Sequence, residues 1–148
     1  VSAREETAPR GAKVGSSPSG ADMALVVDVS PAKTPDASGD NVYEMEGGAM
    51  IAMGPNMDRA MAKQLVELAK EKEIPYQIEV MGGDTGTNAW VIQVSGQGIP
   101  CGLLSIPQRY MHTTIESISL KDAKAVRDLM VAYARSLEEK EEQPCSIC

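Results

Sequence analysis

The chain has 148 residues, the size of a single domain, and a formal net charge of −7. Nucleic-acid-binding proteins gather Lys and Arg on one face, and here these residues are scattered, so we expect no nucleic-acid partner. No apolar run approaches the ~20 residues of a membrane helix, and the first residues lack the basic-then-apolar order of a signal peptide. The missing span predicts no membrane partner. Three cysteines are too few for a disulfide framework, which fits a reducing compartment and predicts a cytoplasmic protein.

Short apolar segments alternate with helical patterns along the first half of the chain. Residues 24–29 are apolar and rich in β-branched side chains, which predicts a buried strand ending near Asp28. Residues 30–48 are rich in Pro, Gly, Ser and Asp and predict a loop, and residues 48–54 predict a second strand or turn. Apolar residues then recur at helical spacing over 57–72, until Ile74-Pro75 ends the pattern.

The second half continues the alternation. It predicts a strand over 76–81, a helix over 87–94 and a buried strand over 101–106. Residues 119–122, Ser-Leu-Lys-Asp, have the form of a capping box ahead of a last helix. Because strands and helices alternate, the sequence predicts an α/β fold with a largely parallel sheet and helices on both faces.

The sequence ends in an acidic segment. Residues 138–142 are typical of a solvated helix end, so we expect one domain over 1–137 and a flexible acidic tail over 138–148. The closing Cys-Ser-Ile-Cys also matches a Cys-x-x-Cys metal or redox pair, and a prenylation box at Cys145. A redox pair is expected at a helix start beside a strand, and prenylation requires a eukaryotic host, so the tail interpretation is favoured.

Three polar features come at or just after the ends of apparent strands: the pair Glu5-Glu6, Asp28, and His112, the only histidine. Open α/β sheets place their chemistry at the carboxyl ends of strands. Carboxylates and an imidazole are the usual ligands of zinc or a similar divalent ion, and a further carboxylate can act as general base. Taken singly, each residue is more often a cap, a turn residue or a hydrogen-bonded polar group. Spacing alone therefore leaves open both a metal site and an ordinary structural role for these residues.

A series of short motifs adds to this pattern. In order, they are Arg-Glu-Glu at 4–6 with Arg-Gly-Ala at 10–12, Val-Val-Asp-Val at 26–29, Thr-Pro at 34–35, Ala-Met-Gly-Pro-Asn at 52–56, Ile-Pro-Tyr-Gln at 74–77, Gly-Thr-Asn-Ala at 86–89, Gly-Ile-Pro at 98–100 and Ser-Ile-Pro-Gln-Arg-Tyr-Met-His at 105–112. Together they resemble the C-terminal half of the catalytic domain in the glutamyl aminopeptidase and TET-type metallopeptidase family, some of whose members are labelled cellulase M. The resemblance runs from about residue 3 to residue 136.

The resemblance implies a fold, an activity and a set of roles. The fold is the three-layer αβα sandwich of zinc peptidases, present here only in its C-terminal portion. Family members hold two divalent metal ions, usually zinc or cobalt, remove N-terminal residues from peptides, and assemble into homo-oligomers such as dodecamers. By position, Glu5 resembles the general base, Glu6 and His112 resemble ligands of one metal, and Asp28 resembles a ligand of the other.

The chain also departs from the family pattern. Thr7-Ala8-Pro9 replaces the usual Val-Gly-Leu, Asn88 stands where Asp is frequent, and Lys33 stands where Asp is common. These changes bear on specificity more than on metal binding. In the family, one histidine ligand, the bridging aspartate and an aspartate that orients the histidine lie upstream of the region matched here.

The missing upstream ligands make this chain, by resemblance, a C-terminal fragment of a binuclear metallo-aminopeptidase. Because a metal site gains affinity from closure by three or four preorganised groups, we expect the fragment alone to bind metal weakly and to be nearly inactive. Two alternatives stay open: a non-catalytic assembly module on the same fold, and a related metallohydrolase such as a deacetylase.

Overall fold

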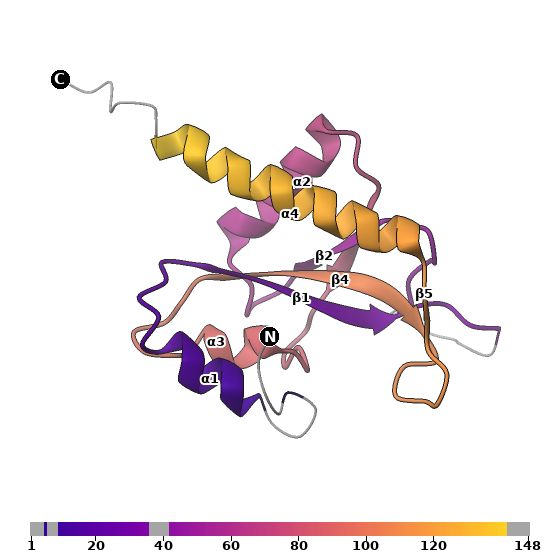
Figure 1. Cartoon of the computed structure of the whole chain (residues 1–148), viewed down its shortest axis with the longest axis horizontal. Helices are drawn as coiled ribbons and strands as arrows, with labels where there is room; N and C mark the ends of the chain where they lie inside the picture. Colours follow the sequence, from indigo (N-terminus) through magenta and orange to yellow (C-terminus); the bar gives the residue numbers. More distant parts are fainter. Residues whose placement is uncertain (1–4, 6–8, 36–41, 142–148) are drawn as a thin grey trace.

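The computed structural model describes residues 5, 9–35 and 42–141, and the chain folds into a sheet with helices on either side (Figure 1). The elements in chain order are α1 (Arg10–Ser16), β1 (Ala24–Pro31), β2 (Ala49–Met53), α2 (Arg59–Glu71), β3 (Tyr76–Val80), α3 (Asn88–Ile92), β4 (Cys101–Arg109), β5 (Ser117–Ile118) and α4 (Leu120–Glu141). The predicted strands and helices are therefore confirmed in kind and order. β1 and β4 both extend beyond their predicted ends, and α3 is shorter than predicted.

The sheet is mixed rather than largely parallel, which corrects the sequence-based expectation. Its strand order is β1-β4-β2-β3, and β5 pairs with β4. β1 runs parallel to β4 and β2 runs parallel to β3, but β2 and β4 meet antiparallel at Met50 opposite Ser105 and Ile51 opposite Leu104. Because β1 is parallel to β4 and β2 is antiparallel to β4, β2 also runs opposite to β1.

The helices lie on both faces of the sheet, as predicted. α2 and α4 cover one face, and α1 and α3 lie against the other (Figure 1). Successive β4 side chains point to opposite faces, so Leu104 packs with Leu65 and Leu129 of the first core. Leu103 packs with Val26 of β1 in the second core. The continuous apolar run of β4 is explained by this burial on both sides.

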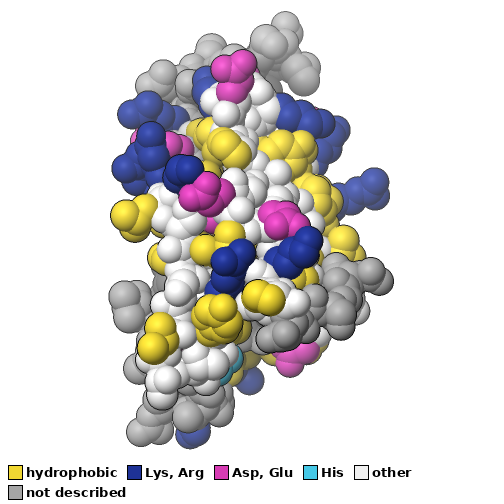
Figure 2. Space-filling model, turned by 90° about the vertical axis from the view of Figure 1, so that its right-hand side faces the viewer, with side chains coloured by type: hydrophobic (Ala, Val, Ile, Leu, Met, Phe, Trp, Pro, Cys, Tyr) yellow, Lys and Arg dark blue, Asp and Glu magenta, His cyan; other side chains and the backbone are white. Residues whose placement is uncertain are grey.

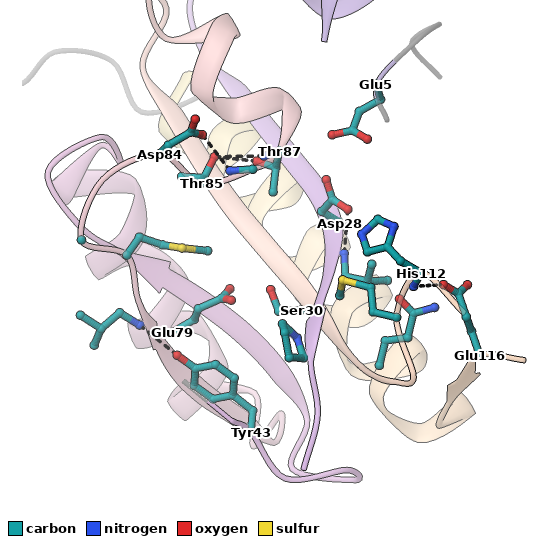
Figure 3. A pocket seen from close by; sticks show the side chains of 18 residues that line it. Glu5, Asp28, Ser30, Tyr43, Glu79, Asp84, Thr85, Thr87, His112 and Glu116 are labelled. Atoms are coloured by element: carbon teal, nitrogen blue, oxygen red, sulfur yellow. Dashed lines mark hydrogen bonds between the residues drawn. The ribbon is translucent and has the colours of Figure 1, made fainter. Parts of the chain in front are cut away.

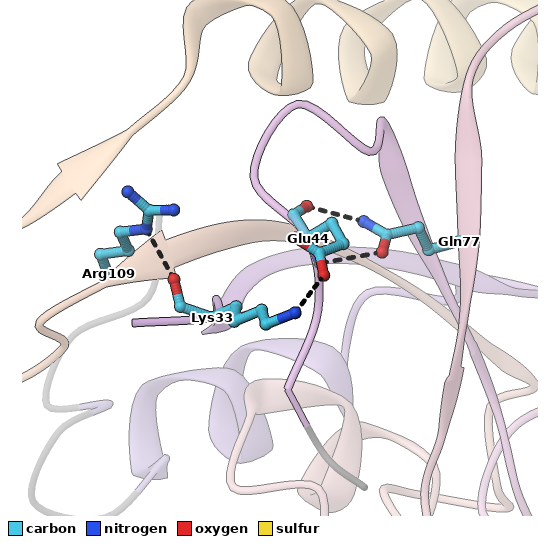
Figure 4. A network of polar contacts seen from close by, with 4 residues as sticks. All are labelled: Lys33, Glu44, Gln77 and Arg109. Atoms are coloured by element: carbon cyan, nitrogen blue, oxygen red, sulfur yellow. Dashed lines mark hydrogen bonds and ion pairs between the residues drawn. The ribbon is translucent and has the colours of Figure 1, made fainter. Parts of the chain in front are cut away.

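A polar network joins the connection between β1 and β2 to the neighbouring strands (Figure 4). Lys33 Nζ lies 3.0 Å from Glu44 Oε1, and Arg109 Nε of β4 donates to the Lys33 carbonyl at 2.7 Å. The Gln77 amide of β3 accepts from the Glu44 N–H and donates to the Glu44 carbonyl, both at 3.0 Å. The contacts to backbone groups fix the path of the connection more than the exposed ion pair does.

The first turn of α4 is held by a contact that the capping-box prediction did not include. Ser119 Oγ accepts from Lys121 N at 3.2 Å, as an N-cap side chain should. The Asp122 carboxylate, which is fully buried, does not form the reciprocal half of the box, because it accepts from Glu46 N and Gly48 N, each at 2.8 Å. The backbone N–H groups ahead of β2 need acceptors once they are buried. Asp122 thereby ties the start of α4 to the start of β2.

α4 runs to Glu141, past the predicted domain end at residue 137, and the tail at 142–148, with Cys145 and Cys148, lies outside the described residues. On the face shown in Figure 2, apolar side chains are interspersed with Lys, Arg, Asp and Glu. Among the described helices, none is both long and apolar enough to cross a membrane.

We expect Asp122→Ala to lower the free energy of unfolding by about 2–4 kcal/mol, because it leaves the buried N–H of Gly48 and the part-buried N–H of Glu46 without their acceptor. Urea denaturation of the protein measures this. Asp128→Ala on the same helix is the matched control, since Asp128 pairs with its exposed neighbour Arg127 and its loss should cost less than about 0.5 kcal/mol. Equal losses in the two variants would contradict the role given to Asp122.

Candidate functional site

A cavity of about 520 Å³ opens over the face of the sheet that carries α1 and α3 (Figure 3). Along β1, Val26 packs in the apolar core on this face, and Asp28 and Ser30 continue the same face toward the strand's carboxyl end. Along β4, Leu103 is followed on this face by Ser105 in the same way. The change from apolar to polar side chains along both strands makes the floor of the cavity polar.

The structure brings together three of the four predicted site residues. Glu5, Asp28 and His112 all line the cavity, although they come from the start of the chain, from β1 and from the loop after β4. Asp28 is half-buried, and its Oδ1 accepts from Val29 N at 2.9 Å. Figure 3 shows the His112 imidazole beside Asp28, with Glu5 at the same end of the cavity. The fourth residue, Glu6, lies outside the described residues.

The loop after β4 holds His112 in an unusual backbone conformation. Tyr110 and His112 have φ values of 60° and 61°, in the left-handed region that non-glycine residues seldom adopt. The loop is fixed by its own hydrogen bonds: His112 N donates to Glu116 Oε1 at 2.7 Å, and Thr113 Oγ1 lies 2.6 Å from the Tyr110 carbonyl oxygen. Such strain persists where the surrounding contacts determine it, which is typical of functional loops.

A buried carboxylate forms the other end of the cavity. The Glu79 side chain on β3 is 4% exposed, and Ser105 Oγ donates to its Oε2 at 2.8 Å. Burial raises the pKa of Glu79, hydrogen bonds from the Ser30 and Ser105 hydroxyls oppose that rise, and the charge of Asp28 adds to it. Sequence reasoning missed this residue.

The pattern of β3 explains why Glu79 was missed. Apolar and polar residues alternate along this strand, which predicts that Ile78 and Val80 are inside and Glu79 is outside. The structure reverses this, with Ile78 and Val80 exposed and Glu79 buried. β3 is the last strand in the sheet order, and the side chains of Ile78 and Val80 on its apolar face are exposed. A signal was nonetheless present, since an acidic residue amid β-branched and apolar residues is costly unless it has partners.

The donor types at this end of the cavity suit a divalent cation, because carboxylate oxygens and an imidazole nitrogen are the usual ligands of zinc-like ions. Within residues 5, 9–35 and 42–141, however, no three His, Cys, Asp or Glu side chains are arranged to hold a metal ion. The residues present therefore fit such an ion in chemical kind, and they make up only part of a ligand set.

Comparison with known proteins agrees with this arrangement. The sequence model of the M42 glutamyl aminopeptidase family matches residues 1–129. This chain belongs to that family. It is 37% identical over 140 residues to a lysyl aminopeptidase of Pyrococcus furiosus, an alignment that covers 95% of this chain and 39% of that relative. The predicted family resemblance, and its restriction to a C-terminal portion, are thus confirmed.

Solved structures share the fold. An aminopeptidase from the archaeon Desulfurococcus kamchatkensis superposes with a TM-score of 0.79 at 30% identity, over 88% of this chain and 38% of that one. A TET aminopeptidase from a marine sediment archaeon, a member of the Thaumarchaeota, superposes with a TM-score of 0.77 at 28% identity, over 86% of this chain and 37% of that one. The α/β fold is that of these aminopeptidases, and the chain spans about two fifths of their length.

We expect Glu79→Gln to change how stability depends on pH. A raised folded-state pKa means that the contribution of Glu79 is fully present below the ordinary Glu pKa of 4.5 and is lost as pH rises through the folded value. The substitution removes this loss, so the stability of the variant relative to the native protein should increase as the pH rises above about 4.5. Urea unfolding over a series of pH values that starts below 4.5 measures it, and Glu67→Gln on the exposed face of α2 is the matched control. A flat difference for Glu79→Gln would contradict the shift.

The Glu116 contact makes a separate prediction about the loop. Glu116→Ala removes the acceptor of the His112 N–H, so amide hydrogen exchange at His112 should become about 2 to 10 times faster, the equivalent of one hydrogen bond. Glu116→Gln keeps an acceptor oxygen and should stay near the native rate. Equal exchange in all three proteins would mean that this bond does not hold the loop.

Proposed function

We propose that the complete protein is a metal-dependent aminopeptidase, and that this chain supplies the C-terminal part of its catalytic domain. The observation that carries the proposal is the convergence of Glu5, Asp28 and His112 on one cavity from three distant parts of the sequence. Membership of the M42 glutamyl aminopeptidase family supports it. The substrates proposed are peptides with a free N-terminus.

We assign the roles as follows. Glu5 is the general base, whose carboxylate takes a proton from the attacking water and passes it to the leaving amine. His112 and Glu6 hold one metal ion, and Asp28 holds the other. A pair of divalent ions, zinc or cobalt, would supply Lewis-acid activation of the peptide carbonyl and of the water. The bond from Val29 N to Asp28 Oδ1 and the loop bond to Glu116 keep the two ligands in place.

The remaining ligands belong, by this proposal, to the part of the protein outside this chain. Because the described residues give only part of a ligand set, the isolated chain should bind metal weakly and cleave no peptide at a useful rate. The complete protein is proposed to be a cytoplasmic homo-oligomer, a dodecamer by resemblance. Support for a contact surface comes from Ile115, Ile118 and Leu120, which are exposed around β5.

The test uses the full-length protein with added cobalt or zinc and a panel of aminoacyl-p-nitroanilides. We expect hydrolysis that EDTA abolishes and metal restores, and a loss of at least about 100-fold in kcat/KM for His112→Ala or Asp28→Ala. Glu67→Gln on the outer face of α2 is the matched control and should retain native activity, since Glu67 lies 3.7 Å from exposed Lys63 and away from the cavity.

Two outcomes would contradict the proposal. If the metal-supplemented full-length protein cleaves no anilide, the non-catalytic assembly module becomes the better account of the fold. If the isolated chain binds one or two ions tightly, its site is not a partial one.

A further inference from the structure

A groove on the α2 face of the sheet, where β2 ends and α2 begins, combines an apolar floor with two cations. Its volume is about 430 Å³, and we call it the α2 groove. The side chains that matter here are Met53, Met57, Ala62 and Val66 on the floor, with Arg59 and Lys63 beside them. No Asp or Glu lies among its described lining residues. The groove therefore suits an apolar side chain that is accompanied by a carboxylate.

The cations and part of the apolar surface of the α2 groove are accessible. Arg59 is exposed at the first position of α2. Lys63 Nζ lies 3.7 Å from Glu67 Oε1, but this exposed pair contributes little and leaves the ammonium group in contact with solvent. Val80 of β3 pairs in register with Met53 and is 68% exposed, so the apolar surface continues from the groove onto β3.

The segment at residues 113–120, which we call the β5 segment, has the complementary features. Three large apolar side chains are exposed on it: Ile115 at 74%, Ile118 at 43% and Leu120 at 83%. Glu116, which is also exposed, is its only charged residue. The next residue in the chain, Lys121, pairs with Glu46 at 2.7 Å. Figure 2 views the molecule from the side on which β5 lies in Figure 1, and apolar side chains reach the surface there.

The α2 groove and the β5 segment lie at opposite ends of β4. At the start of α2, Asp58 N donates to the carbonyl of Cys101, the first residue of β4, at 2.8 Å. Near the other end of β4, Gln108 pairs with Ile118 of the β5 segment. Seven steps of ~3.3 Å along the strand separate the two ends by about 23 Å. A copy therefore cannot place its own β5 segment in its own groove.

Charge decides how two copies can meet through these surfaces. Groove against groove brings Arg59 and Lys63 close to the same cations, and segment against segment brings Glu116 close to Glu116, so both symmetric pairings are opposed by like charges. Segment against groove joins apolar side chains and opposite charges. Because a carboxylate accepts several hydrogen bonds, Glu116 can pair with a cation and keep its bond from His112 N.

We propose that the α2 groove of one copy of the complete protein binds the β5 segment of a second copy, head to tail. The inference rests on the proposed function, in which the complete protein is a homo-oligomer, and it names surfaces that join the copies. Apolar side chains of the segment fill the groove, and Glu116 pairs with Arg59 and Lys63. Each copy offers one groove and one segment, so the contact repeats from copy to copy and forms a ring when the rotation closes. It also sets a neighbour's cations beside the loop that carries His112.

The first test compares the masses of full-length proteins by native mass spectrometry. A groove variant carries Arg59→Glu with Lys63→Glu, and a segment variant carries Ile115→Ser with Leu120→Ser, all at exposed positions. Each variant alone should lose about half of the native mass or more, because every copy takes part in two such contacts. The two variants expressed together should form heavier complexes that contain both, since one keeps its segment and the other keeps its groove.

The matched control for the mass measurement lies on α4. Lys124→Glu with Val131→Ser also reverses an exposed charge and removes an exposed apolar side chain, and this variant should keep the native mass.

Cross-linking tests the contact in a second way. In a background of Cys145→Ser and Cys148→Ser, a chain with both Lys63→Cys and Ile118→Cys should be joined between copies by a short bismaleimide. Either substitution alone should give no cross-link, because groove does not meet groove and segment does not meet segment. Lys63→Cys with Val131→Cys is the control and should also give none. The remaining cysteine, Cys101, is buried.

The outcomes separate this inference from the proposed function. Native mass in both folded variants, a mixture no heavier than its components, or no cross-link in the double variant overturns the contact, as does a native protein that is a single copy in solution. Circular dichroism identifies a variant that fails to fold, in which case the cross-link decides. Neither measurement uses hydrolysis, so a protein that assembles in this way and cleaves no anilide contradicts the aminopeptidase proposal alone.

Discussion

The parallel ladder between β1 and β4 is the constraint on which the rest of the molecule depends. Its register pairs Ala24 with Cys101 and continues to Pro31 opposite Gln108, with Asp28 opposite Ser105. Because the two strands run in the same direction, their carboxyl ends reach the same edge of the sheet. This register sets the side chain of Asp28 close to the loop that carries His112. A slip of one residue would turn Asp28 to the other face and separate the two groups.

The same ladder divides one face of the sheet into an apolar and a polar half. α3 covers the apolar half, where Val26 and Leu103 are buried, and the cavity lies over the polar half, where Ser30 and Ser105 face Glu79 across the sheet. The serine hydroxyls satisfy a carboxylate that would otherwise be costly to bury. The apolar residues whose packing stabilises the sheet and the polar residues that form the floor of the cavity therefore lie next to each other on one face of the sheet.

The partial nature of the chain shapes the chemistry that can be assigned to it. Glu5, Asp28 and His112 converge without completing a ligand set among the described residues, and the chain spans about two fifths of the length of the aminopeptidases that it resembles. In the proposed assignment the metal site is divided between two parts of a polypeptide and is assembled by folding, so its affinity for metal and the folding of the domain are coupled. The buried ties of this portion, such as the one from Asp122 to Glu46 and Gly48, hold its share of the site in position.

The sequence by itself determined the elements and much of the site. Local patterns located the four main strands and helices α2, α3 and α4, because strand and helix periods are local properties, whereas α1 was not predicted. The motif series identified the family, and it named Asp28 and His112 before the structure placed them in one cavity. Element ends were less exact, since β4 continues through Pro107 to Arg109 by pairing with β1 and β5, contacts that no local pattern contains.

Only the tertiary structure decided the direction of β2, the use of Asp122 and the burial of Glu79. Strand direction depends on whether a connection crosses the sheet, and the pattern of a strand does not record the path of the connection. The local pattern predicts that Asp122 caps its own helix. Its carboxylate instead accepts hydrogen bonds from two backbone N–H groups that are distant in the sequence. On β3, alternation indicated the wrong inner face, because which face is buried depends on where the helices and the neighbouring strands lie. Long-range contacts of this kind exist only once the chain has folded, so they are fixed by packing rather than by local sequence.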